Sequence, residues 1–349
     1  MRKKKVNPAL LVAVLVAAVA AAFLIVQPAL EAQPAAAPTP TPQVPVSDGD
    51  GLTSVQRFIV LPDDGIESLT DLIGSARKRV FMKMYMLTDQ RIVDALAQAQ
   101  KNGADVRVML EDHPFGAANS GQQAIDLLKA AGITTKVSNP AFRLTHEKSF
   151  TIDDVAVILT ANMTKSAFSR NREFGVVDAE QGDVDEIVAA FNADWDRAGF
   201  VPSRPNLVWS PDNSRERINR VIEKATRTLD VYAEIVVDDQ QVDLLAQAAK
   251  RGVKVRLITS PSSGEDTSSS APGLDALQSG GVKVRLVSSP YMHAKAFVSD
   301  GALAFVGSEN ISTASLDFNR ELGVVLADRD AIRRISTAFE RDWNKGVER

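Results

Sequence analysis

The chain has 349 residues, of which 45% are apolar and 24% are charged, so it is long enough for two domains or for one large domain made of two halves. It contains no cysteine, which excludes disulfides, thiolate metal sites and cysteine nucleophiles. The net charge of −4 provides no overall positive field for polyanions, so nucleic-acid binding would require a local basic groove.

Residues 1–27 are predicted to form an N-terminal transmembrane anchor. Basic residues at positions 2–5 precede an uncharged apolar run from Ala9 to Val26. As a helix this run would span about 27 Å, close to the thickness of a bilayer's hydrocarbon core. The basic cluster should stay in the cytoplasm and place the rest of the chain outside it. Small residues follow the run at Ala29 and Ala32, so the alternative is a cleaved signal segment and a secreted protein.

Residues 28–50 are rich in proline and alanine and are expected to form an extended, semi-rigid linker. The remainder is an internal duplication, with a first half at 51–203 and a second half at 204–349. The segments "THEKSFTIDD", "NREFGVV" and "AFNADWDRAG" recur, in the same order, as "MHAKAFVSDG", "NRELGVV" and "AFERDWNKG", at an offset of 147 or 148 residues.

Within each half, apolar strands alternate with helical stripes of apolar residues. The predicted strands are 79–86, 104–110, 228–237 and 253–259, and the predicted helices are 89–103 and 239–252. Such βαβ units predict an α/β fold in which each half is a mainly parallel sheet flanked by helices. Two similar halves are expected to pack together with one active site at their interface.

The segment "MHAKAFVSDG" presents a histidine and a lysine side by side. Alternation along a strand places His293 and Lys295 on one face, and Asp300 opens a tight turn. The first half repeats the pattern with His146, Lys148 and Asp153. A single copy would most simply be a half-exposed strand, whereas two copies at matching positions of a duplication favour a shared catalytic site.

These residues resemble the signature of the phospholipase D superfamily, which is His-x-Lys, four residues, Asp, six residues and Gly-Ser-x-Asn. The second half fits it in full, ending with Gly307, Ser308 and Asn310. The first half is one residue shorter and has Thr160 and Ala161 where glycine and serine are expected, although Asn162 is recognisable. The missing serine places one phosphate contact of the first half in question.

The resemblance implies phosphodiester chemistry that needs no metal and no other cofactor. The residues expected to hold the phosphate are Lys148, Lys295, Asn162, Asn310 and Ser308, because cationic and amide groups can neutralise and bind its anionic oxygens. By the family's usual assignment, His146 attacks phosphorus and forms a phosphohistidine, while His293 acts as the acid and base. The residues alone do not decide which histidine attacks phosphorus and which acts as the acid, since either imidazole suits either role.

The catalytic set expected from the resemblance also includes four carboxylates. Asp153 and Asp300 belong to the motif itself. Glu173 and Glu321, in matching "NREFG" and "NRELG" segments, would accept a hydrogen bond from a histidine ring and so determine its tautomer. The alternative is that these two glutamates are surface carboxylates paired with the arginine that precedes each of them.

His113 is the only other histidine, and it follows a predicted strand end, where ligand crevices form in α/β sheets. A loop residue without a role is the simpler interpretation. The adjacent Glu111, Asp112 and His113 do not predict a metal site, because neighbouring residues rarely converge on one ion. The polar loop 260–273 is expected to be exposed and to influence access to the site.

The function placed first is hydrolysis, or transfer, of phospholipid head groups at a membrane surface. A tether would keep the site near the bilayer and raise the effective substrate concentration. The alternatives are a cardiolipin-synthase-like phosphatidyl transferase, an endonuclease of the same superfamily and a non-catalytic binding module. Residues 51–349 hold 36 Lys and Arg against 41 Asp and Glu, which makes nucleic acid the weaker substrate candidate. No obligate protein partner is inferred.

Overall fold

The computed structural model describes residues 53–114, 120–261 and 270–349. These described residues belong to one compact unit. The expected anchor at 1–27 and linker at 28–50, and most of the polar loop at 260–273, lie outside the described residues. Within the described ranges, no helix combines the length and the apolarity needed to cross a membrane.

The first half contains a mixed sheet with the order β1-β7-β6-β5-β2-β3-β4. Its strands are β1 (Val55–Leu61), β2 (Arg79–Met84), β3 (Asp105–Leu110), β4 (Thr134–Val137), β5 (Lys148–Ile152), β6 (Val155–Leu159) and β7 (Asn171–Asp178). Only the β2–β3 and β3–β4 pairs are parallel, and the other pairs along this order are antiparallel.

The second half repeats this topology in a sheet with the order β16-β11-β10-β9-β13-β14-β15-β8. Its strands are β8 (Leu207–Ser210), β9 (Thr228–Tyr232), β10 (Lys254–Thr259), β11 (Lys283–Leu286), β13 (Ala296–Ser299), β14 (Leu303–Gly307), β15 (Glu321–Leu326) and β16 (Val347–Glu348). The prediction of two similar α/β halves is therefore confirmed.

The prediction of mainly parallel sheets is wrong. After each His-x-Lys segment β5 and β6, like β13 and β14, form a hairpin, and β7 and β15 return antiparallel to β6 and β14 after a segment that contains a short helix. The βαβ units identified from the sequence supply only the parallel strands at one side of each sheet. Hairpin-linked strands must run antiparallel because the short turn reverses the chain.

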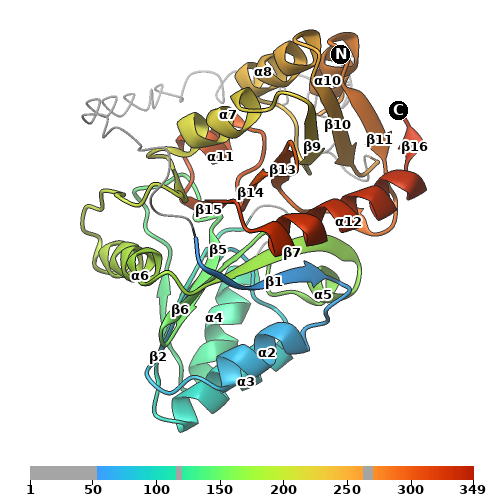
Figure 1. Ribbon diagram of the computed structural model, residues 1–349. Coiled ribbons are helices and arrows are strands. Elements are labelled where there is room, and N and C mark those ends of the chain that lie inside the picture. Colours follow the sequence, from blue (N-terminus) through green and yellow to red (C-terminus); the bar gives the residue numbers. More distant parts are fainter. Residues whose placement is uncertain (1–52, 115–119, 262–269) are drawn as a thin grey trace, which may run out of the picture. The chain divides into compact units, whose positions relative to one another are not determined.

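Helices cover the outer face of each sheet, and two long helices lie between the halves (Figure 1). The helices of the first half are α2 (Glu67–Gly74), α3 (Gln90–Lys101), α4 (Ser120–Ala130), α5 (Lys165–Ser169) and α6 (Gln181–Asp196). Those of the second half are α7 (Ser214–Glu223), α8 (Asp239–Lys250), α10 (Ala271–Ser279), α11 (Thr313–Asp317) and α12 (Arg329–Lys345). The N-caps Asp89 and Asp238 each accept a backbone hydrogen bond at the start of α3 and α8, which explains where both predicted helices begin.

A continuous apolar core joins the two halves. It includes Ile158 and Phe174 from the first sheet and Val306 and Val324 from the second, and residues of α6 and α12 add to it. Burying these faces against each other removes apolar surface from water at roughly 25 cal/mol per Å². The two sheets are therefore held as one body, which a site shared between the halves requires.

Two buried ion pairs cross the interface in a reciprocal arrangement. Arg172 of the first half donates to Asp342 of the second half at 2.7 Å, and Arg320 of the second half donates to Asp194 of the first half at 2.9 Å. Lys83 adds a second cation to Asp194 at 2.8 Å. Because both buried pairs form only when the two halves are packed in this way, they favour this arrangement of the halves.

Candidate active site

Each His-x-Lys segment runs beside the strand that carries the other half's glutamate. The backbone N–H of His146 donates to the carbonyl of Arg320 at 2.9 Å, directly before Glu321. In the second half, β12 (Tyr291–Met292) pairs in parallel with the start of β7, directly before Glu173. Backbone pairing across the interface therefore brings each histidine to the opposite half's carboxylate.

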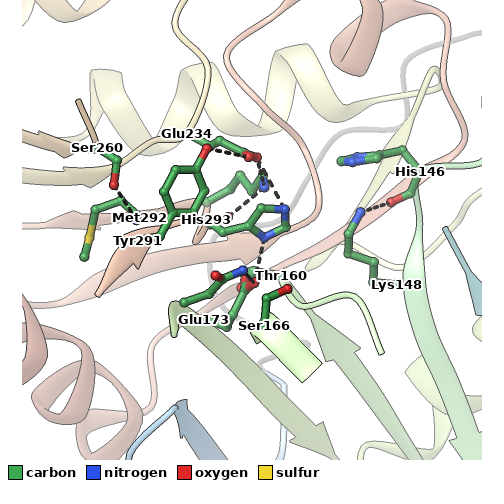
Figure 2. A network of polar contacts seen from close by, with 12 residues as sticks. His146, Lys148, Thr160, Ser166, Glu173, Glu234, Ser260, Tyr291, Met292 and His293 are labelled. Carbon is green, nitrogen blue, oxygen red and sulfur yellow. Dashed lines mark hydrogen bonds and ion pairs between the residues drawn. The ribbon is translucent and has the colours of Figure 1, made fainter. Parts of the chain in front are cut away.

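Both histidine–glutamate contacts join a residue of one half to a residue of the other half. His146 Nδ1 lies 2.8 Å from Glu321 Oε2 in a hydrogen bond, and His293 Nδ1 lies 2.7 Å from Glu173 Oε1 in a less well aligned ion-pair contact. Both glutamates are completely buried, and Figure 2 shows the His293–Glu173 pair with His146 opposite it. The alternative of surface carboxylates paired with the preceding arginines is excluded, because Arg172 and Arg320 bind aspartates instead.

The two lysines lie beside the histidines and are also buried. Lys148 Nζ donates to the carbonyl of His146 at 2.6 Å and lies 5.1 Å from the ring centre of Tyr85. Lys295 Nζ donates to the carbonyl of His293 at 2.6 Å. Repulsion from Lys295 is one of the causes that lower the pKa of Lys148, and an anion entering between the two ammonium groups would be bound by both.

Asn162 and Asn310 follow β6 and β14, in the same place of each half. The Oδ1 atoms of both side chains are buried and have no hydrogen-bond partner within the described part of the chain. Buried amide groups are normally hydrogen-bonded, so each of these amide oxygens can still accept a hydrogen bond from a ligand, whereas a phosphate oxygen would need the amide N–H groups as donors.

The site disfavours protonation of one histidine and one lysine. Burial is the largest cause that lowers the pKa of His146 to about 4, and the neighbouring lysines add to it against the opposing effect of Glu321. Burial and the repulsion from Lys295 lower the pKa of Lys148 to about 7. At neutral pH His146 is therefore a neutral imidazole, and its hydrogen bond to Glu321 leaves the lone pair on Nε2.

Asp153 and Asp300, expected among the catalytic residues, lie away from the site. Each is in the hairpin turn at the far end of its strand, five residues and about 16 Å from the motif lysine. The carboxylate of Asp153 accepts backbone N–H bonds from residues 77–79, and that of Asp300 accepts them from residues 226–228. Their catalytic assignment is corrected to a structural one, since they anchor the hairpin to the start of β2 and β9.

The length difference between the two motifs is located in this same turn. In the first half Ile152 pairs with Val155, which leaves two residues in the turn. In the second half Ser299 pairs with Leu303, which leaves three. The extra residue therefore does not fall in the Gly-Ser-x-Asn segment, where the sequence comparison had placed it.

Once the gap is moved to the turn, Thr160 occupies the position of Ser308. Both residues donate a backbone hydrogen bond to the neighbouring strand, to Phe174 and Leu322 respectively, and both hydroxyls accept one from the same residue. The hydroxyl is therefore present in both halves, and no contact is missing from the first. Because the Ser308 hydroxyl is fully buried and bonded to the backbone of Leu322, its expected phosphate contact is corrected to a role in joining the strands.

Three polar residues near the histidines were not identified from the sequence. Tyr85 packs edge-on against His146 at 4.7 Å between ring centres. Glu234 lies 3.5 Å from His293 Nε2 and 2.6 Å from Lys295 Nζ, and Tyr291 donates to Glu234 at 3.3 Å (Figure 2). Tyr85 and Glu234 follow the parallel strands β2 and β9, and the crevice rule for strand ends could have found them.

His113 takes no part in this cluster. Its side chain is 85% exposed and lies 3.0 Å from that of the neighbouring Asp112. The buried Glu111 instead accepts the backbone N–H of Thr145 at 2.8 Å and so holds the segment before His146. Across the described ranges, no group of three or more histidine, aspartate or glutamate side chains has the arrangement of a metal site.

A duplicated α/β fold with two His-x-Lys segments, each facing the other half's glutamate, defines a site of the phospholipase D type. The chain belongs to the phospholipase D superfamily, since the family model described as "Cardiolipin synthase, PLD-like domain" matches residues 69–195 and 218–343.

Curated relatives carry the same name. A cardiolipin synthase from Oceanobacillus iheyensis is 23% identical over 331 residues, covering 81% of this chain and 67% of the relative. A cardiolipin synthase 2 from Staphylococcus epidermidis is 29% identical over 156 residues, covering 42% of this chain. The chain spans only 31% of that staphylococcal relative.

Solved structures share the fold at low sequence identity. A polyphosphate kinase from Porphyromonas gingivalis has a TM-score of 0.67 at 17% identity, covering 84% of this chain and 48% of that one. A phosphatidylserine synthase from Haemophilus influenzae Rd KW20 has a TM-score of 0.63 at 14% identity, covering 86% and 88%. Their folds match the duplicated architecture described above.

Proposed function

We propose that this protein is a phosphatidyl transferase that moves the phosphatidyl group of one phospholipid to an alcohol acceptor, through a phosphohistidine on His146. The observation that carries the proposal is the crossed pairing of each histidine with the other half's glutamate, which makes one two-histidine site. The family match and the relatives named cardiolipin synthase support transfer over hydrolysis. The sequence alone favoured hydrolysis over transfer, and this preference is now reversed.

In the first step, the lone pair on His146 Nε2 forms a bond to phosphorus. The bond between phosphorus and the leaving alcohol's oxygen breaks, and His293 protonates that oxygen. Lys148, Lys295, Asn162 and Asn310 hold the non-bridging oxygens, where negative charge is concentrated in the transition state. Glu321 keeps the proton of His146 on Nδ1, so that the attacking nitrogen stays free.

In the second step, the acceptor alcohol gives its proton to His293 Nε2, and its oxygen attacks phosphorus. The bond between phosphorus and His146 breaks, which restores the neutral imidazole. The same intermediate reacts with water in a hydrolase, so the acceptor alone distinguishes the two activities. We also propose that residues 1–27 anchor the chain in a membrane and residues 28–50 link it to the halves at 51–203 and 204–349. This arrangement would place the site beside its lipid substrate.

The test is incubation of the full chain with radiolabelled phosphatidylglycerol vesicles and, separately, with plasmid DNA, both with EDTA. Formation of a diphosphatidyl product, which carries four acyl chains, supports transfer. Phosphatidic acid as the sole product contradicts transfer and returns the proposal to hydrolysis, and DNA cleavage without lipid turnover contradicts both.

The two histidines provide matched variants. His146→Ala and His293→Ala should each lose at least about 100-fold in rate, since each removes a reacting or acid–base group. His113→Ala is the control and should retain full activity, because that side chain is exposed and pairs with the neighbouring Asp112. Mass spectrometry after rapid alkaline denaturation should detect the phosphorylated His146 in His293→Ala with a substrate whose leaving group is good. Label on His293 in His146→Ala would reverse the two roles.

A further inference from the structure

The two histidines of the site face different numbers of carboxylates. Among the described residues, His146 forms one such ion-pair contact, from Nδ1 to Glu321. His293 forms two, because Glu173 lies 2.7 Å from Nδ1 and Glu234 lies 3.5 Å from Nε2. The histidine that exchanges protons with the leaving and entering alcohols therefore has a carboxylate at each ring nitrogen.

Glu234 has no acidic counterpart in the first half. It follows β9 at the same sequence distance at which Tyr85 follows β2, and the first residue of each strand donates its N–H to the turn aspartate of its half. Tyr85 presents its ring edge to His146, with 4.7 Å between ring centres. The second carboxylate at His293 is therefore an addition to the duplicated motif and not a part of it.

Glu234 is ionised and held in place beside the ring. Burial opposes its ionisation, but His293 and Lys295 lower the pKa of Glu234 to about 2. Its Oε2 lies 2.6 Å from Lys295 Nζ, and its Oε1 accepts from Tyr291 at 3.3 Å (Figure 2). Lys295 has three N–H donors and uses two, on Glu234 and on the carbonyl of His293, so one donor remains for a phosphate oxygen.

The charges around His293 favour its imidazolium form. An anion within about 4–6 Å stabilises a protonated ring, and a cation at that distance opposes it. Two carboxylates contact the ring itself, whereas Lys295 contacts the backbone carbonyl of His293. The titratable groups that face the His293–Glu234 pair are Glu173, Lys295, Tyr291, His146 and Lys148.

We propose that Glu234 is a positioning residue for the acid–base step, which keeps a proton on His293 Nε2 until the leaving oxygen takes it. The inference deepens the proposed function and rests on it. In the first step this proton moves to the leaving oxygen as the bond from that oxygen to phosphorus breaks, and Nε2 regains its lone pair. In the second step the acceptor alcohol returns a proton to Nε2, and Glu234 again stabilises the imidazolium. The neutral Tyr85 supplies no such charge, so His146 stays unprotonated as the nucleophile.

The first test compares two short-chain phosphatidyl esters, one of p-nitrophenol and one of 1-propanol. The quantity measured is the ratio of kcat/KM for the nitrophenyl ester to that for the propyl ester, for consumption by any route. A propoxide needs a proton as it leaves, whereas nitrophenolate leaves without an acid. In Glu234→Gln this ratio should rise at least about 10-fold, within the 10²–10⁴-fold that a general acid contributes. Damage to the fold would lower both rates and leave the ratio unchanged.

The second test observes the proton by NMR of the full chain labelled with ¹⁵N-histidine. The chain has three histidines, and the exposed His113 serves as an internal standard. In Glu234→Gln, His293 should lose its doubly protonated form at a pH about one unit lower than in wild type, since one opposite charge is removed. Glu234→Asp should restore part of both effects.

Glu223→Gln, at an exposed position on α7, is the matched control and should leave the ester ratio and the His293 titration unchanged. An unchanged ester ratio in Glu234→Gln, or an unchanged titration of His293, would overturn the role of Glu234. The titration needs no turnover, whereas the proposed transfer is tested by the identity of the product. The two proposals can therefore fail separately.

Discussion

The charge of Lys148 should control how activity depends on pH. The pKa of Lys148 is lowered from 10.5 to about 7, mainly by burial and then by Lys295. That difference corresponds to about 5 kcal/mol of cost for holding a second cation in the empty site. Since the neutral amine cannot neutralise a phosphate oxygen, kcat/KM should fall about tenfold for each pH unit above 7. The acid limb should lie near pH 4, where His146 becomes protonated and loses its nucleophilic lone pair.

The assay is kcat/KM for a chromogenic phosphodiester from pH 3 to 10 at constant ionic strength. In Lys148→Arg the guanidinium stays charged over this range, so the absolute rate should fall and the alkaline limb should move to the pH at which His293, the acid of the first step, loses its proton. Lys101→Arg, an exposed substitution at the end of α3, is the control and should leave the profile unchanged. The limb in kcat should lie at higher pH than the limb in kcat/KM, because bound phosphate favours the ammonium. An alkaline limb that persists unchanged in Lys148→Arg would refute the assignment to Lys148.

Three further predictions concern stability. Burial and the nearby carboxylates raise the pKa of Glu309 well above its ordinary value, so its folded form keeps a proton that the unfolded chain releases above about pH 4.5. Stability should therefore decline as the pH rises above that value, and Glu309→Gln should be more stable than wild type by about 1–3 kcal/mol in urea unfolding at pH 8 but not at pH 4. Asp342→Ala should cost about 3–5 kcal/mol in the same assay by removing the bidentate acceptor of the buried Arg172 and the acceptor of the Tyr232 hydroxyl, whereas the exposed Asp243→Ala should cost under about 0.5 kcal/mol. Asp300→Ala should lower the thermal midpoint while kcat stays within about threefold of wild type, and a loss above 100-fold in a folded protein would restore its catalytic assignment.

Local patterns were sufficient to predict the duplication, the helices α3 and α8 and the two His-Lys pairs. Helix boundaries follow from capping residues and apolar periodicity, which are properties of neighbouring positions. His146 and His293 were identifiable because a motif repeated at one offset is readable without a fold. The partners Glu173 and Glu321 were also visible as repeated segments, but which histidine each one serves was not.

The tertiary structure decided that each glutamate serves the other half's histidine, because this depends on backbone pairing between segments more than 100 residues apart, such as β12 with β7. It also placed the length difference in the hairpin turn, which gives Thr160 the position of Ser308 and removes the asymmetry suspected there. The real asymmetry, Tyr85 against Glu234, belongs to no motif. Glu234 could not be recognised as a site residue from its position after a strand, because its role depends on the histidine and lysine that packing brings within 4 Å of it. The sequence by itself determines the local conformation and reveals the repeated His-x-Lys motif. Contacts between distant segments depend on how the two sheets bury their apolar faces together.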